Sequence, residues 1–414
     1  MRGEDMPAPP VKSVAPLLPL PFMEFVGLVA SLMALNALAI DTMLPALHYI
    51  AEEYQLANAN DQQLVIFSYV AGFGIPQLVF GPISDRFGRK RVILGCIVAY
   101  TIAGFACMAA GSFTALLAIR FLQGVAAAGV RVISVSIVRD LTAGRGMARI
   151  MSLVMTVFMV VPILAPVIGQ GIMQIAPWRW TFGILGFAGL ATFLWVALRL
   201  PETLPEERRN PLSVRATARA YGQVISNRVA FGYMAASGVI FGSLFSYVAS
   251  SEQIFRVVFG KEETFGLWFA GIACALCVAN FTNSTIVERF GMRRISHTVL
   301  CAFIVLAALN LTLCLIFGEN LAIFYPLFAV TFACFGMIGA NFSALSMEPL
   351  GKIAGTGSAA QGFATTTVAS VFGWMVASRF NGHVVTILEG YVALGIAALA
   401  IVLFTERGKL FSSR

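Results

Sequence analysis

One carboxylate stands alone inside an apolar stretch that is long enough to cross a lipid bilayer. Asp41 lies in Phe22–Ile50, within the order Asp41-Thr-Met-Leu-Pro45. The nine residues from Asp41 to Ile50 correspond to about 13 Å of helix. A charge at that depth is costly and normally faces the protein interior or water, so we interpret Asp41 as the proton-carrying group. The alternative is an interfacial residue near the helix end.

Two arginines lie in another apolar stretch, Phe113–Val138. Arg120 is about 10 Å from the start of that stretch, which predicts a depth similar to that of Asp41. Because a buried charge stays ionised beside an opposite one, we predict that Arg120 pairs with Asp41, as a proton switch or as a structural ion pair. Arg131 follows on nearly the same helix face. It either lines the same cavity or extends to the headgroups.

Two further segments have a distinctive residue order. The first is a charged segment between two apolar stretches, and we expect it to form a short loop: Gly81-Pro-Ile-Ser-Asp85-Arg86-Phe-Gly88-Arg89-Lys90-Arg91. Its glycines allow a tight turn, and its ordered spacing is more specific than that of a basic loop that only sets topology. The second segment contains Pro162, Ala165, Pro166 and Gly169. Small residues and prolines let helices approach and bend, so packing is its default role.

Composition places the chain in a membrane. The 414 residues are 58% hydrophobic and 12% charged, whereas soluble proteins average about 25% charged residues. The net charge of +8 therefore indicates membrane topology and anionic lipid rather than nucleic acid. All seven cysteines lie in or beside apolar stretches, where cysteine acts as a small hydrophobe, so no metal site is predicted.

Twelve stretches approach or exceed the roughly 20 apolar residues that a spanning helix needs. They are Phe22–Ile50, Gln62–Ser84, Val92–Ala110, Phe113–Val138, Ala148–Ile172, Trp180–Leu200, Val229–Ser251, Phe265–Val287, Ile295–Phe317, Leu321–Met347, Gly357–Phe380 and Val384–Thr405. We predict an all-α membrane protein with a disordered tail (1–21), a six-helix bundle (22–200), a linker (201–228), a second bundle (229–405) and a short tail (406–414).

The basic residues predict the orientation. With both ends inside the cell, 22 of the 28 lysines and arginines lie on the inner side and four on the outer side. Such an excess of positive charge is typical of cytoplasmic loops. We therefore expect both termini, and the linker, to be cytoplasmic.

A weaker copy of the charged segment follows 203 residues later, as Ser284-Thr-Ile-Val-Glu288-Arg289-Phe-Gly291-Met-Arg293-Arg294. Its place after the eighth predicted helix matches that of the first copy after the second. The chain therefore reads as a duplicated six-helix unit.

The charged segment resembles the signature loop of the major facilitator superfamily. Further motifs resemble those of its drug:proton antiporters, most of all the Bcr/CflA group: Asp41, Leu44, Pro45 and Ala46; Arg120, Gln123 and Gly124; Arg139 and Asp140; Pro162, Ala165, Pro166 and Gly169; Trp178, Arg179 and Trp180; and Pro201 to Pro205. Two residues depart from the pattern. Gln170 replaces a second glycine, and Arg131 replaces an apolar residue, which questions a preference for cationic compounds.

The resemblance implies two pseudo-symmetric six-helix bundles that export drugs by alternating access. Protonation of Asp41 would weaken its pairing with Arg120 and let the bundles rock. The latch of the outward-facing state would comprise Gly81, Asp85, Arg86, Gly88, Arg89 and, as partner of Asp85, Arg139. The expected substrate site comprises Asn36, Asp41, Tyr69, Arg120, Arg131, Phe158 and Phe241.

These features predict a proton-coupled antiporter, not an enzyme, in a bacterial inner membrane. We expect neutral or weakly polar amphipathic drugs of the phenicol or bicyclomycin type as substrates, with protons and lipid as partners. We expect a monomer, no nucleic acid and no cofactor beyond the proton gradient. A proton-coupled metabolite symporter, or a metabolite exporter of the same fold, is the alternative. A non-transporting membrane protein, either an enzyme or a scaffold, is an alternative from another class. An enzyme would show His, Glu or Cys clustered at one face, and the sequence has no such cluster.

Overall fold

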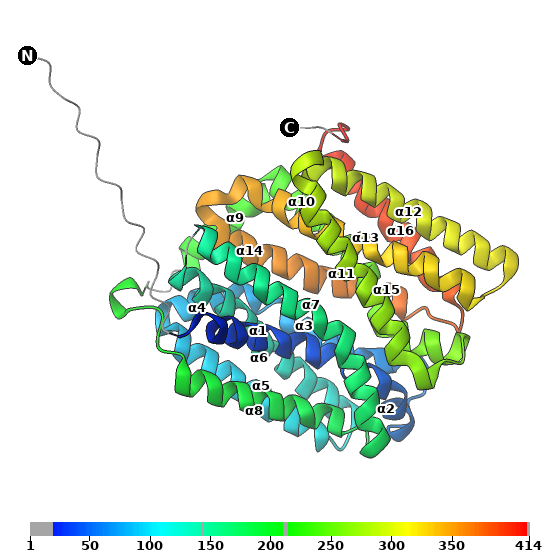
Figure 1. Ribbon diagram of the computed structural model, residues 1–414, viewed down its shortest axis with the longest axis horizontal. Helices are drawn as coiled ribbons and strands as arrows, with labels where there is room; N and C mark the ends of the chain where they lie inside the picture. The colour runs from blue at the N-terminus through cyan, green and yellow to red at the C-terminus, as the bar shows by residue number, and fades with distance from the viewer. Residues whose placement is uncertain (1–19, 143, 210–213, 412–414) are drawn as a thin grey trace, which may run out of the picture.

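A computed structural model describes residues 20–142, 144–209 and 214–411. In these residues the protein consists of helices that form two groups. Figure 1 shows the N-terminal half in blue to green beside the C-terminal half in yellow to red. Within the described residues, ten helices are long and apolar enough to span a membrane, and a bent pair can be counted as an eleventh. The predicted span Gly357–Phe380 corresponds to three consecutive shorter elements from Ala354 to Ala377. The predicted all-α, twelve-helix architecture is therefore confirmed.

The N-terminal half contains eight α-helices and two 3-10 turns. In chain order they are α1 (Phe22–Asp41), η1 (Leu44–Ala46), α2 (Leu47–Glu53), η2 (Ala59–Gln63), α3 (Leu64–Gly74), α4 (Gln77–Phe87), α5 (Arg89–Met108), α6 (Phe113–Leu141), α7 (Gly144–Ile175) and α8 (Trp180–Arg199).

The linker and the C-terminal half follow. They comprise η3 (Glu206–Arg208), α9 (Val214–Ser226), α10 (Arg228–Gln253), the π-turn η4 (Ile254–Val258), η5 (Glu262–Thr264), α11 (Phe265–Phe290), α12 (Met292–Phe317), α13 (Leu321–Met347), η6 (Glu348–Ile353), α14 (Ala354–Phe363), the π-turn η7 (Ala364–Val368), α15 (Ala369–Ala377) and α16 (Val384–Thr405).

Helix packing repeats between the halves, as the duplicated charged segment predicts. In the N-terminal half α3 packs on α6, α5 on α8 and α1 on α7; the corresponding pairs in the C-terminal half are α11 with α13, α12 with α16 and α10 with α15. The halves meet along two related seams, α7 against α11 and α3–α4 against α14–η7. Any site that lies between the halves is therefore bordered by α7 and α11 on one side and by α3–α4 and α14–η7 on the other.

The charged segment is mostly helical, which corrects the expectation of a loop. The helix α4 continues to Phe87 and α5 begins at Arg89, so Gly88 alone makes the turn, at φ 92° and ψ 150°. Gly291 makes the same turn in the second copy, at φ 79° and ψ 149°. Only glycine adopts this backbone readily, so each turn needs a glycine and little else.

The predicted second span is bent, and the linker carries a helix that was not predicted. The bend between the end of α3 and the start of α4 is 46°, at Pro76, which has no backbone N–H to donate. In the linker, α9 rests on α4 through a hydrogen bond from the Tyr221 hydroxyl to the Leu78 carbonyl of 2.9 Å. Most of the predicted N-terminal tail, residues 1–19, lies outside the described residues.

We call the end of the molecule that carries α9, Gly88 and Gly291 the linker end. The described ends of the chain also lie on this side: in Figure 1 the start of α1 is at the left and the segment that follows α16 is at the top centre. The opposite end, with α2 and η2, is called the far end.

Candidate functional site

Asp41 is the last residue of α1, and the first predicted span is broken directly after it. The 3-10 turn η1, with Pro45 inside it, connects this break to α2. The carboxylate is buried, with 7% of the residue exposed. Within the described part of the chain, no hydrogen bond or ion pair reaches it. The helix break thus leaves a carboxylate in the interior with no partner of its own.

Arg120 is fully buried in α6, but it does not pair with Asp41, contrary to the prediction. Its guanidinium donates to the carbonyls of Ala39, at 2.9 Å, and Val65, at 3.3 Å, and to Oε1 of Gln123, at 2.7 Å. Carbonyls in the last turn of a helix lack intrahelical partners and attract cations. Because α1 ends at Asp41, the Ala39 carbonyl is such a group and competes with the carboxylate for the guanidinium.

Some of the expected substrate residues lie together around Arg120. The guanidinium carbon lies 4.4 Å from the centre of the Tyr69 ring, and the Tyr69 hydroxyl donates to Oδ1 of Asn36 at 2.8 Å. Phe158 packs instead with the N-terminal core, and Phe241 contacts Phe335 within the C-terminal half. The structure therefore groups Asn36, Tyr69 and Arg120 near the break after Asp41 and places the two phenylalanines elsewhere.

Arg131 contacts a residue that sequence reasoning missed. Its Nη1 donates to Oε1 of Gln77 at 2.7 Å, and Nε2 of Gln77 donates to the Thr366 hydroxyl at 3.1 Å. Gln77 lies in α4, whereas Thr366 lies in η7 of the other half. This three-residue chain therefore crosses the seam between the halves. The sequence feature that could have identified Gln77 is its position as a polar residue inside the predicted span Gln62–Ser84.

The proline-glycine motif of α7 packs on the break after Asp41. A Cβ atom on Gly169 would lie 1.9 Å from the carbonyl oxygen of Thr42, so only glycine allows this approach. Ala165 is fully buried in the same helix. The motif thus holds α7 directly against the residue that follows the unpartnered carboxylate.

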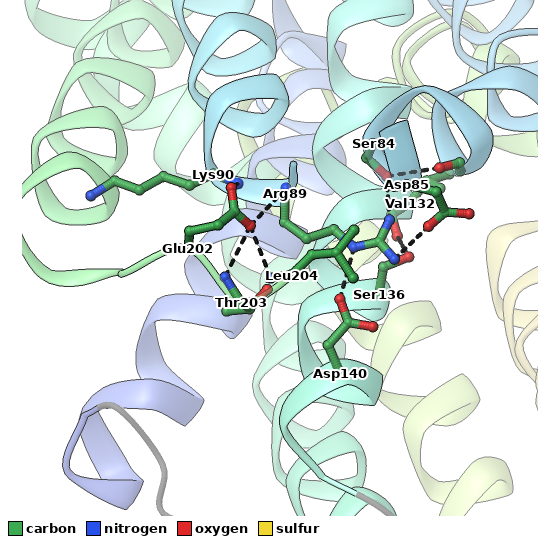
Figure 2. Close-up of polar contacts among 11 residues, drawn as sticks. Ser84, Asp85, Arg89, Lys90, Val132, Ser136, Asp140, Glu202, Thr203 and Leu204 are labelled. Atoms are coloured by element: carbon green, nitrogen blue, oxygen red, sulfur yellow. Dashed lines mark hydrogen bonds and ion pairs between the residues drawn. The ribbon is translucent and has the colours of Figure 1, made fainter. Parts of the chain in front are cut away.

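Figure 2 shows the charged segment at the linker end, where the Arg89 guanidinium lies between two aspartates. Its Nη2 lies 2.5 Å from Oδ1 of Asp85 and its Nε 2.8 Å from Oδ2 of Asp140. Nη1 donates to the Ser84 hydroxyl at 2.5 Å. Asp85 therefore pairs with Arg89 rather than with Arg139, which corrects the predicted partner. Asp85 is near the end of α4 and Arg89 begins α5, so the turn at Gly88 brings the two side chains together.

Arg139 reaches the C-terminal half instead. A Cβ atom on Gly355, near the start of α14, would lie 3.1 Å from its Nη1. The predicted conformational latch thus has two parts in this structure, a buried cluster around Arg89 and an exposed Arg139 that approaches α14.

Glu202 caps the helix that begins with Arg89. Its carboxylate accepts the backbone N–H groups of Arg89 at 2.9 Å and Lys90 at 3.2 Å, as Figure 2 shows. A carboxylate at a helix N-terminus satisfies free N–H donors and complements the helix dipole. The segment Pro201 to Pro205, recognised in the sequence only as the exit from the sixth helix, therefore secures the charged turn.

Polar side chains join the halves at the far end. Nε2 of Gln63 donates to Oε1 of Gln253 at 2.7 Å, and Nε2 of Gln62 donates to Oε2 of the buried Glu252 at 3.2 Å. Nδ2 of Asn60 donates to the Phe380 carbonyl at 2.7 Å. These far-end contacts were not predicted, because each partner alone looks like an ordinary polar residue near a span end.

Gln170, which departs from the antiporter pattern, also bridges the halves. Its Nε2 donates to the Glu262 carbonyl at 2.9 Å, and its Oε1 accepts the Gly266 N–H at 3.0 Å. Glycine at this position could make neither bond. No group of three or more His, Cys, Asp or Glu side chains in the described part of the chain could hold a metal.

Two repeated helix bundles, an interior carboxylate at a helix break and polar contacts across the seam define a multi-pass membrane transporter rather than an enzyme. The chain belongs to the Major Facilitator Superfamily, whose family model matches residues 29–378.

Three relatives are similar to this chain over most of its length. The chain is 32% identical to an uncharacterised MFS-type transporter, YdgK of Bacillus subtilis, over 83% of this chain and 86% of that protein. It is 29% identical to a bicyclomycin resistance protein homolog of Haemophilus influenzae, over 86% and 89%. It is 26% identical to the multidrug resistance protein MdtL of Shigella dysenteriae, over 92% and 95%.

Solved structures share the fold. The crystal structure of a D-xylose–proton symporter aligns with a TM-score of 0.71 at 16% identity, covering 94% of this chain and 99% of that one. At this identity the likeness concerns the fold alone.

Proposed function

We propose that this protein exports small amphipathic drugs from bacteria in exchange for protons, acting as a monomer in the inner membrane. The observation that carries the proposal is Asp41, an interior carboxylate without a partner, beside a helix break on which Gly169 of the antiporter motif packs. A carboxylate inside a membrane protein is typical of a proton relay. Similarity to a bicyclomycin resistance homolog and to MdtL supports drugs as the substrate class.

The mechanism follows from what each protonation state of Asp41 requires. An ionised carboxylate in an apolar interior needs water or a donor, whereas the neutral acid can be enclosed. Protonation from outside would therefore favour closure around an empty site and rotation of the halves. Release of the proton inside, as substrate arrives, would reset the cycle, so inward proton flow drives outward drug flow.

Efflux from cells tests this proposal. Cells that express the protein are loaded with chloramphenicol or bicyclomycin, and retained drug is followed with and without an uncoupler. We expect faster efflux than from cells without the protein, and loss of the difference when the uncoupler collapses the proton gradient. Proton-driven accumulation of a metabolite, with no drug efflux, would support the symporter alternative instead.

We further propose that both termini lie in the cytoplasm, on the strength of the 22-to-4 distribution of basic residues. Fusion of alkaline phosphatase, which is active only outside the cytoplasm, after Arg414 should give an inactive enzyme. Fusion of green fluorescent protein at the same place should fluoresce. The reverse pattern would invert the topology.

A further inference from the structure

Arg131 faces the junction between the halves rather than the lipid headgroups. It lies eleven residues after Arg120 in α6, about 16 Å nearer the linker end. Its guanidinium carbon lies 5.8 Å from the centre of the Phe73 ring. A Cβ atom on Gly362 of α14 would lie 3.4 Å from its Nη1. Contacts from α3, α4 and α14 therefore surround this cation, which resolves the two alternatives left open by the sequence.

The Arg131 guanidinium has donors to spare. A guanidinium carries five N–H donors, and one hydrogen bond, to Gln77, accounts for only one of them. Among the described residues, some buried polar atoms have neither a partner nor exposed surface, and no Arg131 nitrogen is one of them. The nitrogens of Arg131 without a partner therefore retain some exposed surface. No acidic side chain in the described ranges forms an ion pair with Arg131.

The other interior charges do not neutralise it. Arg120 donates to two carbonyls and to Gln123, so each nitrogen of that guanidinium already has a partner. Asp41 follows Ala39, which binds Arg120, and so lies at the level of Arg120 rather than of Arg131. A charge in the membrane interior without a counter-charge is costly. Arg131 therefore has no negative partner among the described residues, and an anionic ligand would supply one.

The segment of the C-terminal half that faces Arg131, from Gly362 of α14 to Thr366 of η7, has an irregular backbone. The π-turn η7 carries Thr366, which receives the hydrogen bond from Gln77. A Cβ atom on Gly362, one turn earlier, would lie 2.3 Å from Oε1 of Gln77. Single π-turns within α-helices occur frequently at functional sites. Both halves thus contribute to one polar cluster with a free cationic face.

We infer that Arg131 binds a carboxylate of the transported compound, with Gln77 and Thr366 linking that contact to the C-terminal half. The inference rests on the proposed function and names the substrate class of the same transport path: amphipathic monoacids. A planar guanidinium fork matches a carboxylate in two parallel hydrogen bonds. Contact through Gln77 to Thr366 would make closure of the halves sensitive to the bound acid.

Binding to the purified protein tests the inference with two probes, chloramphenicol succinate and its methyl ester, which differ in the charge of the carboxylate and in one methyl group. We expect the wild-type protein to bind the acid at least about tenfold more tightly, as one charged hydrogen-bonded contact allows. Arg131→Met should bring the ratio close to one by weakening the acid only. Arg219→Met removes the same charge from the exposed face of α9 and should leave the ratio unchanged.

A second variant controls for the case in which Arg131→Met does not fold. Arg131→Lys keeps the charge and the approximate length but loses the fork, so we expect a folded protein whose preference for the acid falls several-fold. Equal binding of acid and ester by the wild type, or a preference that survives in Arg131→Met, would overturn the inference.

Failure of the inference and failure of the proposed function are distinguishable. Proton-coupled efflux of neutral chloramphenicol, together with equal binding of acid and ester, would overturn only the inference. Selective binding of the acid that Arg131→Met abolishes, in a protein without proton-coupled efflux, would overturn only the proposed function.

Discussion

Asp41 is the residue on which we propose that proton coupling depends. Its burial without a hydrogen-bond partner makes its charge state sensitive to whether water or substrate reaches it. The predicted partner, Arg120, is held by backbone carbonyls rather than by this carboxylate. In this conformation the two groups therefore act separately, one as an ionisable group and one as a packing element.

Asp41→Asn should abolish uphill, pH-driven efflux while leaving drug binding measurable, because the amide cannot carry the proton. The measurement is proton release by the purified protein when chloramphenicol is added. The matched control is Glu288→Gln, which removes an exposed carboxylate from the second charged segment. Release of protons by Asp41→Asn at the wild-type level would exclude Asp41 as the coupling group.

Arg120→Lys should destabilise the protein although it preserves the charge. The ammonium cannot satisfy the two carbonyls and Gln123 at once, so buried acceptors lose their donors at a cost of about 2–4 kcal/mol. Thermal unfolding in detergent should show a lowered Tm. Arg149→Lys, at an exposed position of α7, is the control. If the Tm is unchanged but proton coupling is lost, the result would instead indicate that Arg120 acts as the partner of Asp41.

At the scale of elements, glycine decides where helices cross. Gly169→Ala would place a methyl group 1.9 Å from the Thr42 carbonyl oxygen, so α7 must move away from the break after Asp41. We expect a loss of about 1–3 kcal/mol in stability, as overpacking usually costs, together with slower transport. Unfolding in detergent and drug efflux measure the two effects.

Gly171→Ala is the matched control for this prediction. It lies two residues further along the same helix, and a Cβ atom there would meet no atom within 4 Å. Alanine is favoured over glycine inside a helix by about 1 kcal/mol, so this variant should be neutral or slightly stabilised. Equal damage by both substitutions would show that α7 needs flexibility rather than close contact.

The turn between α4 and α5 carries the second prediction at this scale. Asp85→Asn removes one of the two carboxylates around Arg89 and leaves Asp140 in place. We expect normal membrane insertion but slower transport, because the buried cation would shift towards Asp140 and change the packing of α4 on α6. The rate of drug efflux at saturating drug measures this effect, with the exposed Arg91→Gln as control. An unaltered rate would show that this pair does not control the conformational change.

For the whole molecule, we expect the far-end contacts to set the balance between conformations. Gln63→Leu combined with Gln253→Leu removes hydrogen bonds between the halves, each contributing about 1 kcal/mol. The population open at the far end should therefore rise several-fold. Maleimide labelling of Ser250→Cys, at a buried far-end position, in a background free of other cysteines, would report it.

The control for this prediction is Gln223→Leu, which changes an exposed glutamine of α9 at the linker end. It should leave the labelling rate of the cysteine at position 250 unchanged. Unchanged labelling in the double variant as well would mean that apolar packing, not these amides, holds the far end closed.

Local features of the sequence determined the architecture. Apolar length predicts the spans, and the copies around Gly88 and Gly291 predict the duplication, because helix formation and glycine turns depend on neighbouring residues. The same reasoning singled out Asp41, Arg120 and Arg131 as interior charges, since composition alone makes a charge in an apolar stretch exceptional.

Only the tertiary structure decided which partners these charges have. Arg120 binds the Ala39 carbonyl, which has no partner within α1 because that helix ends at Asp41, and α7 packs closely on Thr42 at the same place. Arg89 binds Asp140, and Gln77 joins Arg131 to Thr366, across 51 and 289 residues of sequence. Side-chain pairing depends on which helices adjoin and on competition from backbone carbonyls, and neither is visible in the local order of residues.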